Sequence, residues 1–301
     1  MVPASTILIL GNTPEGTLLA SYFKSHGFSP LLLGRKRDQN PFTRLEAWNR
    51  SDSIEIQALP QMDIFHACAV VVTVQSFDMI GIIERHIHYL PAHIPILCLT
   101  HGGMERPLIE LATHHPKFSW RIGTCEHDLQ EPIPSFFRSP TSNFRLLWGP
   151  LIYKEEKTKL EVEWHTVDPL FFQWVPHILK EQRIRWLYEL VIGCITASMQ
   201  LSTCGELFNH MGIVANVFAE GYQLGKEWWQ EWTQSEDKLY EGLISQISKK
   251  ADLPSLMYMQ TTKKHKTENE VFAGAATQKY PHLWELSKKI ESMPKLLHMG
   301  G

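Results

Sequence analysis

The sequence predicts an α/β protein of two domains, a parallel-sheet domain followed by an all-helical one. In the first half, short runs of Leu, Ile and Val alternate with amphipathic segments, which is the order that a parallel sheet with crossover helices requires. In the second half, the apolar residues repeat at helical spacing. The length of 301 residues suffices for two domains with separate cores.

The first predicted strand, residues 7–10, runs into a glycine turn that opens a helix. The turn reads Gly-Asn-Thr-Pro-Glu-Gly over residues 11–16. Such a turn binds anions because the first amides of the helix lack partners and the helix dipole favours negative charge. The dinucleotide fingerprint is G-x-G-x-x-G, and here Thr13 replaces its second glycine; a turn without any ligand is the alternative. The candidates for contact with a dinucleotide pyrophosphate are Gly11, Asn12, Thr13 and Gly16.

The second predicted strand, residues 30–33, indicates which dinucleotide would bind. An acidic residue at the end of this strand would hold the ribose 2′-hydroxyl of NAD. The chain has Gly-Arg-Lys-Arg at residues 34–37 instead, and Arg35 suits a 2′-phosphate through a charge-assisted contact. A solvated basic loop is the alternative. Together with the glycine turn, the basic segment predicts a Rossmann-type domain that binds NADP.

Further strands are predicted at residues 53–56, 69–74 and 95–99. The run at 69–74 is rich in β-branched residues and apolar on both faces, as expected of a central parallel strand. A helix with Ile80, Ile83 and Ile87 on one face follows it. The strand at 95–99 leads into His-Gly-Gly-Met at 101–104, at the strand end where open α/β sheets bind ligands.

The sheet domain is predicted to end at residue 168. Residues 120–123 and 144–148 predict two more strands, antiparallel and flanking the sheet. Residues 154–168 are polar and charged, and we take them as the link between a domain at 1–168 and a domain at 169–301. The helices predicted in the second domain cover residues 183–199, 207–229, 238–249, 252–264, 268–276 and 280–293.

Composition excludes several classes of function. Charged residues make up 20% of the chain and the net charge is −3, which argues against binding to nucleic acid or to an acidic membrane surface. The five cysteines are scattered without CxxC spacing, and the histidines form no HExxH motif. We expect reduced thiols, no metal site and a cytoplasmic protein. No apolar run is long enough to span a bilayer, and no signal peptide is recognised.

Four short motifs, in this order along the chain, resemble the ketopantoate reductase (2-dehydropantoate 2-reductase) family. The first is the glycine turn with Arg35 after the second strand. The second is Leu-Thr-His-Gly-Gly-Met at 99–104, similar to the family's Asn-Gly-Met-Gly loop. The third runs from Gly-Thr at 123–124 to Trp-Gly-Pro at 148–150. The fourth pairs Cys-Gly-Glu-Leu at 204–207 with Lys-Thr-Glu-Asn-Glu at 266–270, similar to Asn-Gly-Glu-Leu and Pro-Thr-Glu-Ile-Asp.

The resemblance extends over most of the chain and implies a reaction. Members of the family transfer a hydride from NADPH to the keto group of ketopantoate, which yields pantoate for pantothenate synthesis. A 2-keto acid is therefore the implied substrate. Near the cofactor, the resemblance points to Gly103 and to Gln75, which replaces a family lysine at the end of the fourth predicted strand; Gly102 replaces a family asparagine.

The resemblance also locates the candidate catalytic residues. Glu189 stands where the family has the lysine that serves the keto oxygen. Glu268 matches a family residue near the substrate and the nicotinamide, and Ser255 matches a substrate-binding position. Two family asparagines of the substrate pocket correspond to Gly193 and Ala197.

The role of Glu189 is open between three hypotheses. Burial beside Glu268 would raise the pKa of Glu189 and make it a general acid. Alternatively, Glu189 forms a salt bridge with Arg185 at i, i+4 spacing. In the third hypothesis, Arg183 or Arg185 supplies the missing cation from a neighbouring turn.

Two further interpretations stay open. The chain could be an NADP-binding sensor or scaffold whose chemistry has been lost, or a reductase of another 2-keto acid or imine. The tryptophans at 228, 229 and 232 suggest an aromatic binding platform, or, as the more ordinary use of such a cluster, packing against the core or against a partner subunit. A contact with a partner subunit would make the protein a homodimer.

Overall fold

The chain folds into two compact units, which are described separately. The computed structural model describes residues 5–34, 42–47, 50–57, 66–126, 130–133, 136–138, 144–152, 171–229, 232, 234–263, 267–273 and 278–293. Unit 1 comprises Met1–Thr100 and Met104–Leu179, and unit 2 comprises His101–Gly103 and Lys180–Gly301. The division after Leu179 lies beyond the boundary expected at residue 168. Most of the expected link, residues 153–170, lies outside the described residues.

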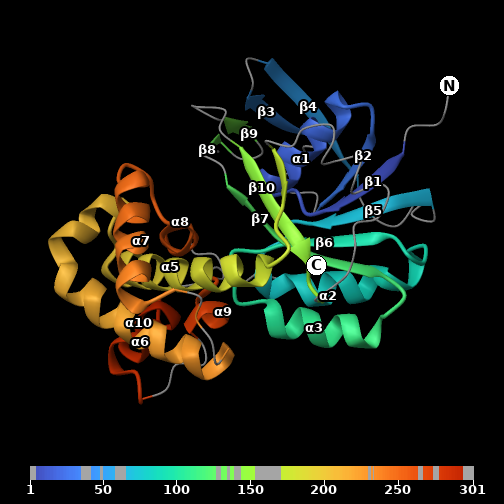
Figure 1. Ribbon diagram of the computed structural model, residues 1–301. Coiled ribbons are helices and arrows are strands. Elements are labelled where there is room, and N and C mark those ends of the chain that lie inside the picture. The colour runs from blue at the N-terminus through green and yellow to red at the C-terminus, as the bar shows by residue number, and fades with distance from the viewer. Residues whose placement is uncertain are drawn as a thin grey trace. The chain divides into compact units, whose positions relative to one another are not determined.

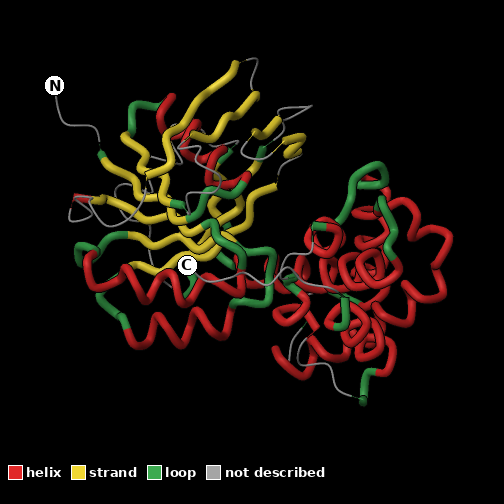
Figure 2. The backbone as a smooth tube through the Cα atoms, turned by 180° about the vertical axis from the view of Figure 1, so that it is seen from behind, coloured by secondary structure: helices red, strands yellow, loops and turns green. Residues whose placement is uncertain are grey.

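Unit 1 is built on one sheet, and Figure 2 shows that the strands belong to this unit. Within the described residues the sheet has eleven strands, in the order β11-β10-β7-β6-β5-β1-β2-β4-β3-β9-β8. The strands are β1 Thr6–Leu10, β2 Ser29–Leu33, β3 Phe42–Ala47, β4 Arg50–Gln57, β5 Ala67–Val72, β6 Pro95–Leu99, β7 Ser119–Glu126, β8 Gln130–Ile133, β9 Phe136–Arg138, β10 Arg145–Pro150 and β11 Phe172–Trp174.

The centre of the sheet is parallel, as predicted. β1 pairs in parallel with β2 on one side and with β5 on the other, and β6 follows β5. The last two predicted strands were expected to be antiparallel. β10 is indeed antiparallel to β7, but β7 itself is parallel to β6. The reason is that the helix α3 (Glu105–His114) makes the crossover between β6 and β7.

Helices cover the sheet because each has an apolar side. α1 (Pro14–Ser25) packs its Leu18, Leu19 and Phe23 against Ile7 and Ile9 of β1. Figure 1 shows α2 (Ser76–His86) and α3 side by side below β5 and β6. A short 3-10 helix, η2 (Ile87–Tyr89), continues α2. The layered arrangement confirms the predicted α/β class.

Unit 2 is helical, which confirms the second half of the fold prediction. Its long helix α5 (Ile178–Met199) is buried on most sides. The helix α6 (Met211–Trp229) approaches it closely at Gly221, where a Cβ atom would lie 2.9 Å from both Leu187 Cδ1 and Leu190 Cδ2. The helices are α5 Ile178–Met199, η3 Cys204–His210, α6 Met211–Trp229, α7 Glu236–Lys249, α8 Leu256–Thr262, α9 Asn269–Ala273 and α10 Pro281–Glu291.

The tryptophans of unit 2 pack inside it. The indole ring of Trp229 lies 4.9 Å from that of Trp186 and 5.9 Å from that of Trp232, edge to face in both cases. Trp186 is fully buried. The core-packing role is therefore confirmed for Trp229 and Trp232, which are partly buried against the core of unit 2, whereas Trp228 is 37% exposed.

Two general expectations can be compared with the described residues. All five cysteines are free thiols, as predicted. No single described helix is long and apolar enough to cross a membrane; only the pair of segments Ile178–Met199 and Cys204–Trp229, bent by 83°, meets that length and composition together.

Candidate functional site

The glycine turn of unit 1 lies where the strand order reverses. After β1 the chain adds β2 and β4 on one side of the sheet, and then returns to add β5 and β6 on the other. The turn at Gly11 follows β1, next to the end of β5. In open α/β sheets this reversal point, at the carboxyl ends of the strands, is where ligands bind.

Gly11 and Gly16 are required by the local geometry. Gly11 has φ +124°, and a Cβ atom there would lie 2.9 Å from the backbone nitrogen of Val74. Its N–H donates to the Leu33 carbonyl at 2.8 Å, which fixes the turn to the end of β2. A Cβ atom on Gly16 would collide with the Gly11 carbonyl oxygen. The two glycines thus bring helix α1 tightly against the strand end.

The cap of α1 uses part of the hydrogen-bonding capacity of the turn. Thr13 is the N-cap residue, and its Oγ1 accepts a hydrogen bond from Gly16 N at 3.2 Å. Pro14 follows as the first helical residue and has no N–H. Glu15 adds a carboxylate in the first turn. Compared with G-x-G-x-x-G, this turn offers a bound phosphate fewer donors, so the cations for it must come from outside the turn.

The other predicted cofactor residues surround the same strand ends. Asn12 packs against the end of β2, because a Cβ atom on Gly34 would lie 2.7 Å from Asn12 Cβ. Gln75 is the N-cap residue of α2 and makes no side-chain capping bond. Thr73, two residues before it, donates to the Gly11 carbonyl at 2.9 Å. Arg35 lies outside the described residues.

The glycine loop after β6 belongs to unit 2. Gly102 and Gly103 have φ +107° and +77°, in the region that favours glycine. A Cβ atom on Gly102 would lie 2.7 Å from Trp186 Cβ and 2.8 Å from the Gln182 carbonyl oxygen. The loop therefore packs directly on α5, and only glycine allows this approach.

Beside this loop, α5 carries Glu189 in a cluster of charges. Lys250 Nζ lies 3.2 Å from Glu189 Oε1, and the Glu189 side chain is only 14% exposed. Arg185 and His101 are the other two charged partners that act on Glu189. We call His101, Arg185, Glu189 and Lys250 the loop cluster.

The general-acid hypothesis for Glu189 is wrong. Burial alone would raise its pKa, but the charges of Lys250, Arg185 and His101 outweigh burial and lower the pKa from 4.5 to about 2. Glu268 is not among the described groups that shift it. Glu189 is therefore ionised at neutral pH, with no proton to donate.

The salt-bridge hypothesis named the wrong partner for Glu189. Glu189 does form an ion pair, but with Lys250 at the end of α7 rather than with Arg185 one turn away on α5. Arg185 directs its Nη2 to His101 Nδ1, at 3.4 Å. Arg183 stacks 5.6 Å above the Trp229 ring. The sequence does not predict Lys250 as the partner of Glu189, because the two residues are 61 positions apart and no local spacing pattern relates them.

Ser255 and Glu268 are both buried in unit 2, at 5% and 1% exposure. Ser255 is the N-cap residue of α8, where its Oγ accepts from Tyr258 N at 3.1 Å. It also lies 2.6 Å from Thr196 Oγ1. Since Thr196 donates to the Ile192 carbonyl at 2.7 Å, the Ser255 hydroxyl is the donor of that bond. Ser255 is thus engaged in capping and packing.

Gly193 is one of the two positions that the resemblance assigns to a substrate pocket, and the space beside it is occupied by Met257. A Cβ atom on Gly193 would lie 3.2 Å from Met257 Cε, so Met257 takes the space of a larger side chain on α5. Glu268 is held by its backbone, whose N–H donates to Gln260 Oε1 at 3.0 Å.

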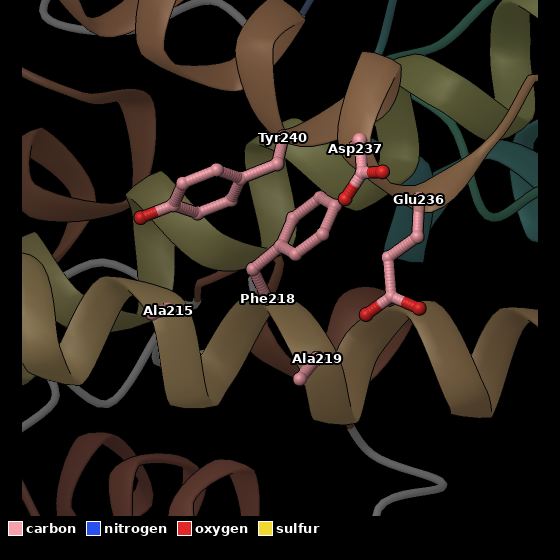
Figure 3. Close-up of a pocket in the computed structure, with 6 residues that line it drawn as sticks. All are labelled: Ala215, Phe218, Ala219, Glu236, Asp237 and Tyr240. Atoms are coloured by element: carbon pink, nitrogen blue, oxygen red, sulfur yellow. The ribbon is translucent and has the colours of Figure 1, made fainter.

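A separate hollow of about 200 Å³ lies between α6 and α7 (Figure 3). Its lining includes two carboxylates, Glu236 and Asp237, and the rings of Phe218 and Tyr240. It contains none of the residues predicted to bind cofactor or substrate. An acidic lining does not favour an organic acid. Among the described residues, no three His, Cys, Asp or Glu side chains gather as a metal site.

Comparison with known proteins shows the fold. No protein-family model matches the sequence, and no curated protein sequence matches it. Among solved structures, a probable 2-dehydropantoate 2-reductase from Bacillus subtilis shares 18% identity at a TM-score of 0.75, over 96% of this chain and 99% of that one.

Two other solved structures cover nearly the same residues. A dimeric ketopantoate reductase from Staphylococcus aureus is 13% identical, with a TM-score of 0.74 over 96% of this chain and 98% of that one. D-mandelate dehydrogenase with NADH and anilino(oxo)acetate is 14% identical, with a TM-score of 0.77 over 96% and 98%. The chain has the fold of the ketopantoate reductases, which confirms the predicted resemblance at the level of the fold.

Proposed function

We propose that the protein is an oxidoreductase that reduces a 2-keto acid with NADPH. The observation that carries the proposal is the glycine turn at the reversal point between β1 and β5, where Gly11 has φ +124°. A backbone that admits no side chain at this edge is suited to close approach of a pyrophosphate. NADPH would supply the hydride.

Each candidate residue has a proposed role. Gly11, Asn12, Thr13 and Gly16 are proposed to bind the pyrophosphate of the dinucleotide, and Arg35 its 2′-phosphate. Gln75 and Gly103 are the other two proposed cofactor-binding residues. Glu268 is the proposed catalytic carboxylate. Because it is ionised and paired with Lys250, Glu189 is proposed to position that cation. Ser255 holds the start of α8 beside the substrate.

Ketopantoate is the first substrate to test, and the product would then be pantoate for pantothenate synthesis. The fold is also that of a D-mandelate dehydrogenase, so benzoylformate, the keto acid of mandelate, belongs in the same panel. A homodimer in the cytoplasm is part of the proposal; a dimeric ketopantoate reductase with this fold supports the oligomeric state.

One observation favours a second candidate, an NADP-binding sensor or scaffold without turnover. The family lysine is replaced by a carboxylate that remains ionised at neutral pH, and a negative charge opposes the charge that develops on a keto oxygen during hydride transfer.

A turnover assay separates the two candidates. Purified protein is mixed with NADPH and each keto acid in turn, and the cofactor absorbance is followed. Oxidation of NADPH that requires a keto acid supports the reductase. NADPH binding with no oxidation across the panel contradicts the reductase and supports the sensor.

A further inference from the structure

Two hydrogen-bond donors on α5 are buried without a partner beside the loop at 101–103. They are the Nε of Arg185 and the indole Nε1 of Trp186, for which the described residues provide no acceptor. Both groups can only donate. Since buried polar groups normally have partners, two adjacent unpaired donors point to an acceptor supplied by a ligand.

Both donors are directed to the same loop. Arg185 contacts His101 through Nη2 at 3.4 Å. A Cβ atom on Gly103 would lie 3.1 Å from Trp186 Cδ1, the ring atom bonded to Nε1. At Gly102 and Gly103 the loop backbone packs directly on this part of α5. Both side chains thus contact the same loop, and a small ligand bound at this loop would accept from both.

The charge of the loop cluster is suited to an anion. Arg185 and Lys250 carry two positive charges against the single carboxylate of Glu189, so the cluster has one excess positive charge even with His101 neutral. Lys250 occupies the Glu189 carboxylate at 3.2 Å, which leaves the Arg185 guanidinium without an acidic hydrogen-bond partner among the described residues. A planar guanidinium is also the side chain best suited to bind a carboxylate.

We propose that Arg185 and Trp186 bind the carboxylate of the 2-keto acid, and that Lys250 keeps Glu189 from competing for Arg185. The inference rests on the proposed function for the identity of the ligand. It assigns specificity to two residues outside the motifs of the resemblance: a substrate must carry an acid group next to its keto group, and an aldehyde or a neutral ketone lacks the acceptor.

The indole N–H signal of Trp186 in a ¹⁵N NMR spectrum tests the inference directly, and it is assigned by its loss in Trp186→Phe. The probes are 3-methyl-2-oxobutanoate, its uncharged amide and inorganic phosphate, each added at millimolar concentration with and without NADPH. We expect the acid to shift the Trp186 signal, and the amide and phosphate to leave it in place. No shift with the acid in either state, or an equal shift with phosphate, contradicts the inference.

Variants give the second readout, by calorimetric titration with the same acid. We expect Arg185→Met to weaken binding by roughly tenfold or more, and Trp186→Phe, which keeps the packed ring, to weaken it a few-fold. Lys249→Met removes one positive charge from an exposed position next to Lys250, and this variant is expected to bind the acid like the wild type. Equal weakening in Lys249→Met would contradict a specific role for Arg185.

The outcomes distinguish the inference from the proposed function. NADPH turnover whose KM for the acid is unchanged in Arg185→Met contradicts the inference and leaves the reductase standing. Arg185-dependent binding of the acid without NADPH oxidation supports the inference and contradicts the reductase.

Discussion

At the scale of single residues, Glu189 shows how its neighbours determine the chemistry of a carboxyl group. The resemblance predicts that it stands at a lysine position, and burial alone would raise its pKa. Lys250, which sequence spacing cannot locate, lowers that pKa to about 2 together with Arg185 and His101. A positive charge thus lies beside Glu189, carried by the C-cap residue of α7.

The ion pair of Glu189 predicts a pH dependence of stability. A carboxyl group whose pKa is lower in the folded than in the unfolded protein stabilises the fold above its unfolded pKa of about 4.5, and this contribution is lost as the pH falls toward about 2. We expect Glu189→Gln to lose about 1 to 3 kcal/mol of unfolding free energy at pH 7, measured by urea titration.

The matched control for that variant is Glu285→Gln, which removes an exposed carboxylate of α10 and should change stability by less than about 0.5 kcal/mol. The difference between wild type and Glu189→Gln should shrink as the pH falls below about 4.5. A difference that stays constant down to pH 3 would show that the charge of Glu189 is not its cause.

At the scale of elements, the sequence predicts the strands and helices whose signals are local. Residues 69–74 and 95–99 predict strands because they are apolar on both faces, and the structure has β5 and β6 there. β3 was missed because burial along it does not follow polarity: the polar Thr43 is buried while the apolar Phe42 is exposed, so the sequence lacks the usual alternation of a strand. Such a strand gains its stability from pairing with β4 and β9, which a local pattern does not record.

Two helical glycines provide a matched test of the turn that joins β1 to α1. A Cβ atom on Gly16 would collide with the Gly11 carbonyl oxygen, whereas a Cβ atom on Gly81 of α2 meets nothing within 4 Å. We expect Gly16→Ala to destabilise the protein by about 1 to 3 kcal/mol. Gly81→Ala should stabilise it by about 0.5 to 1 kcal/mol, since alanine favours a helix. Urea unfolding measures both changes, and the same sign for the two variants would contradict this account.

At the scale of the whole molecule, the order of elements predicts the fold better than it predicts the site. The succession of strands and crossover helices, and then of helices alone, leaves few topologies, and the structure has the fold that the four short motifs indicate. The site depends on contacts between distant residues. Met257 beside Gly193, and Lys250 beside Glu189, follow from the packing of helices in unit 2.

The predicted preference for NADPH over NADH also depends on distant parts of the chain, because it needs both the glycine turn at 11–16 and the basic segment at 34–37. The turn has lost one amide to Pro14, so we expect the affinity for NADPH to depend strongly on the cations. Arg35→Ala should weaken NADPH binding by roughly tenfold and leave the weaker binding of NADH nearly unchanged. Equal losses for the two nucleotides would contradict recognition of the 2′-phosphate.

Calorimetric titration of the purified protein with NADPH, and with NADH for comparison, tests the central claim most directly. We predict saturable binding of NADPH, tighter than that of NADH and weakened by added salt, because a phosphate is bound by cations. The absence of any heat of binding with NADPH or NADP at millimolar concentrations would contradict both the reductase and its sensor alternative.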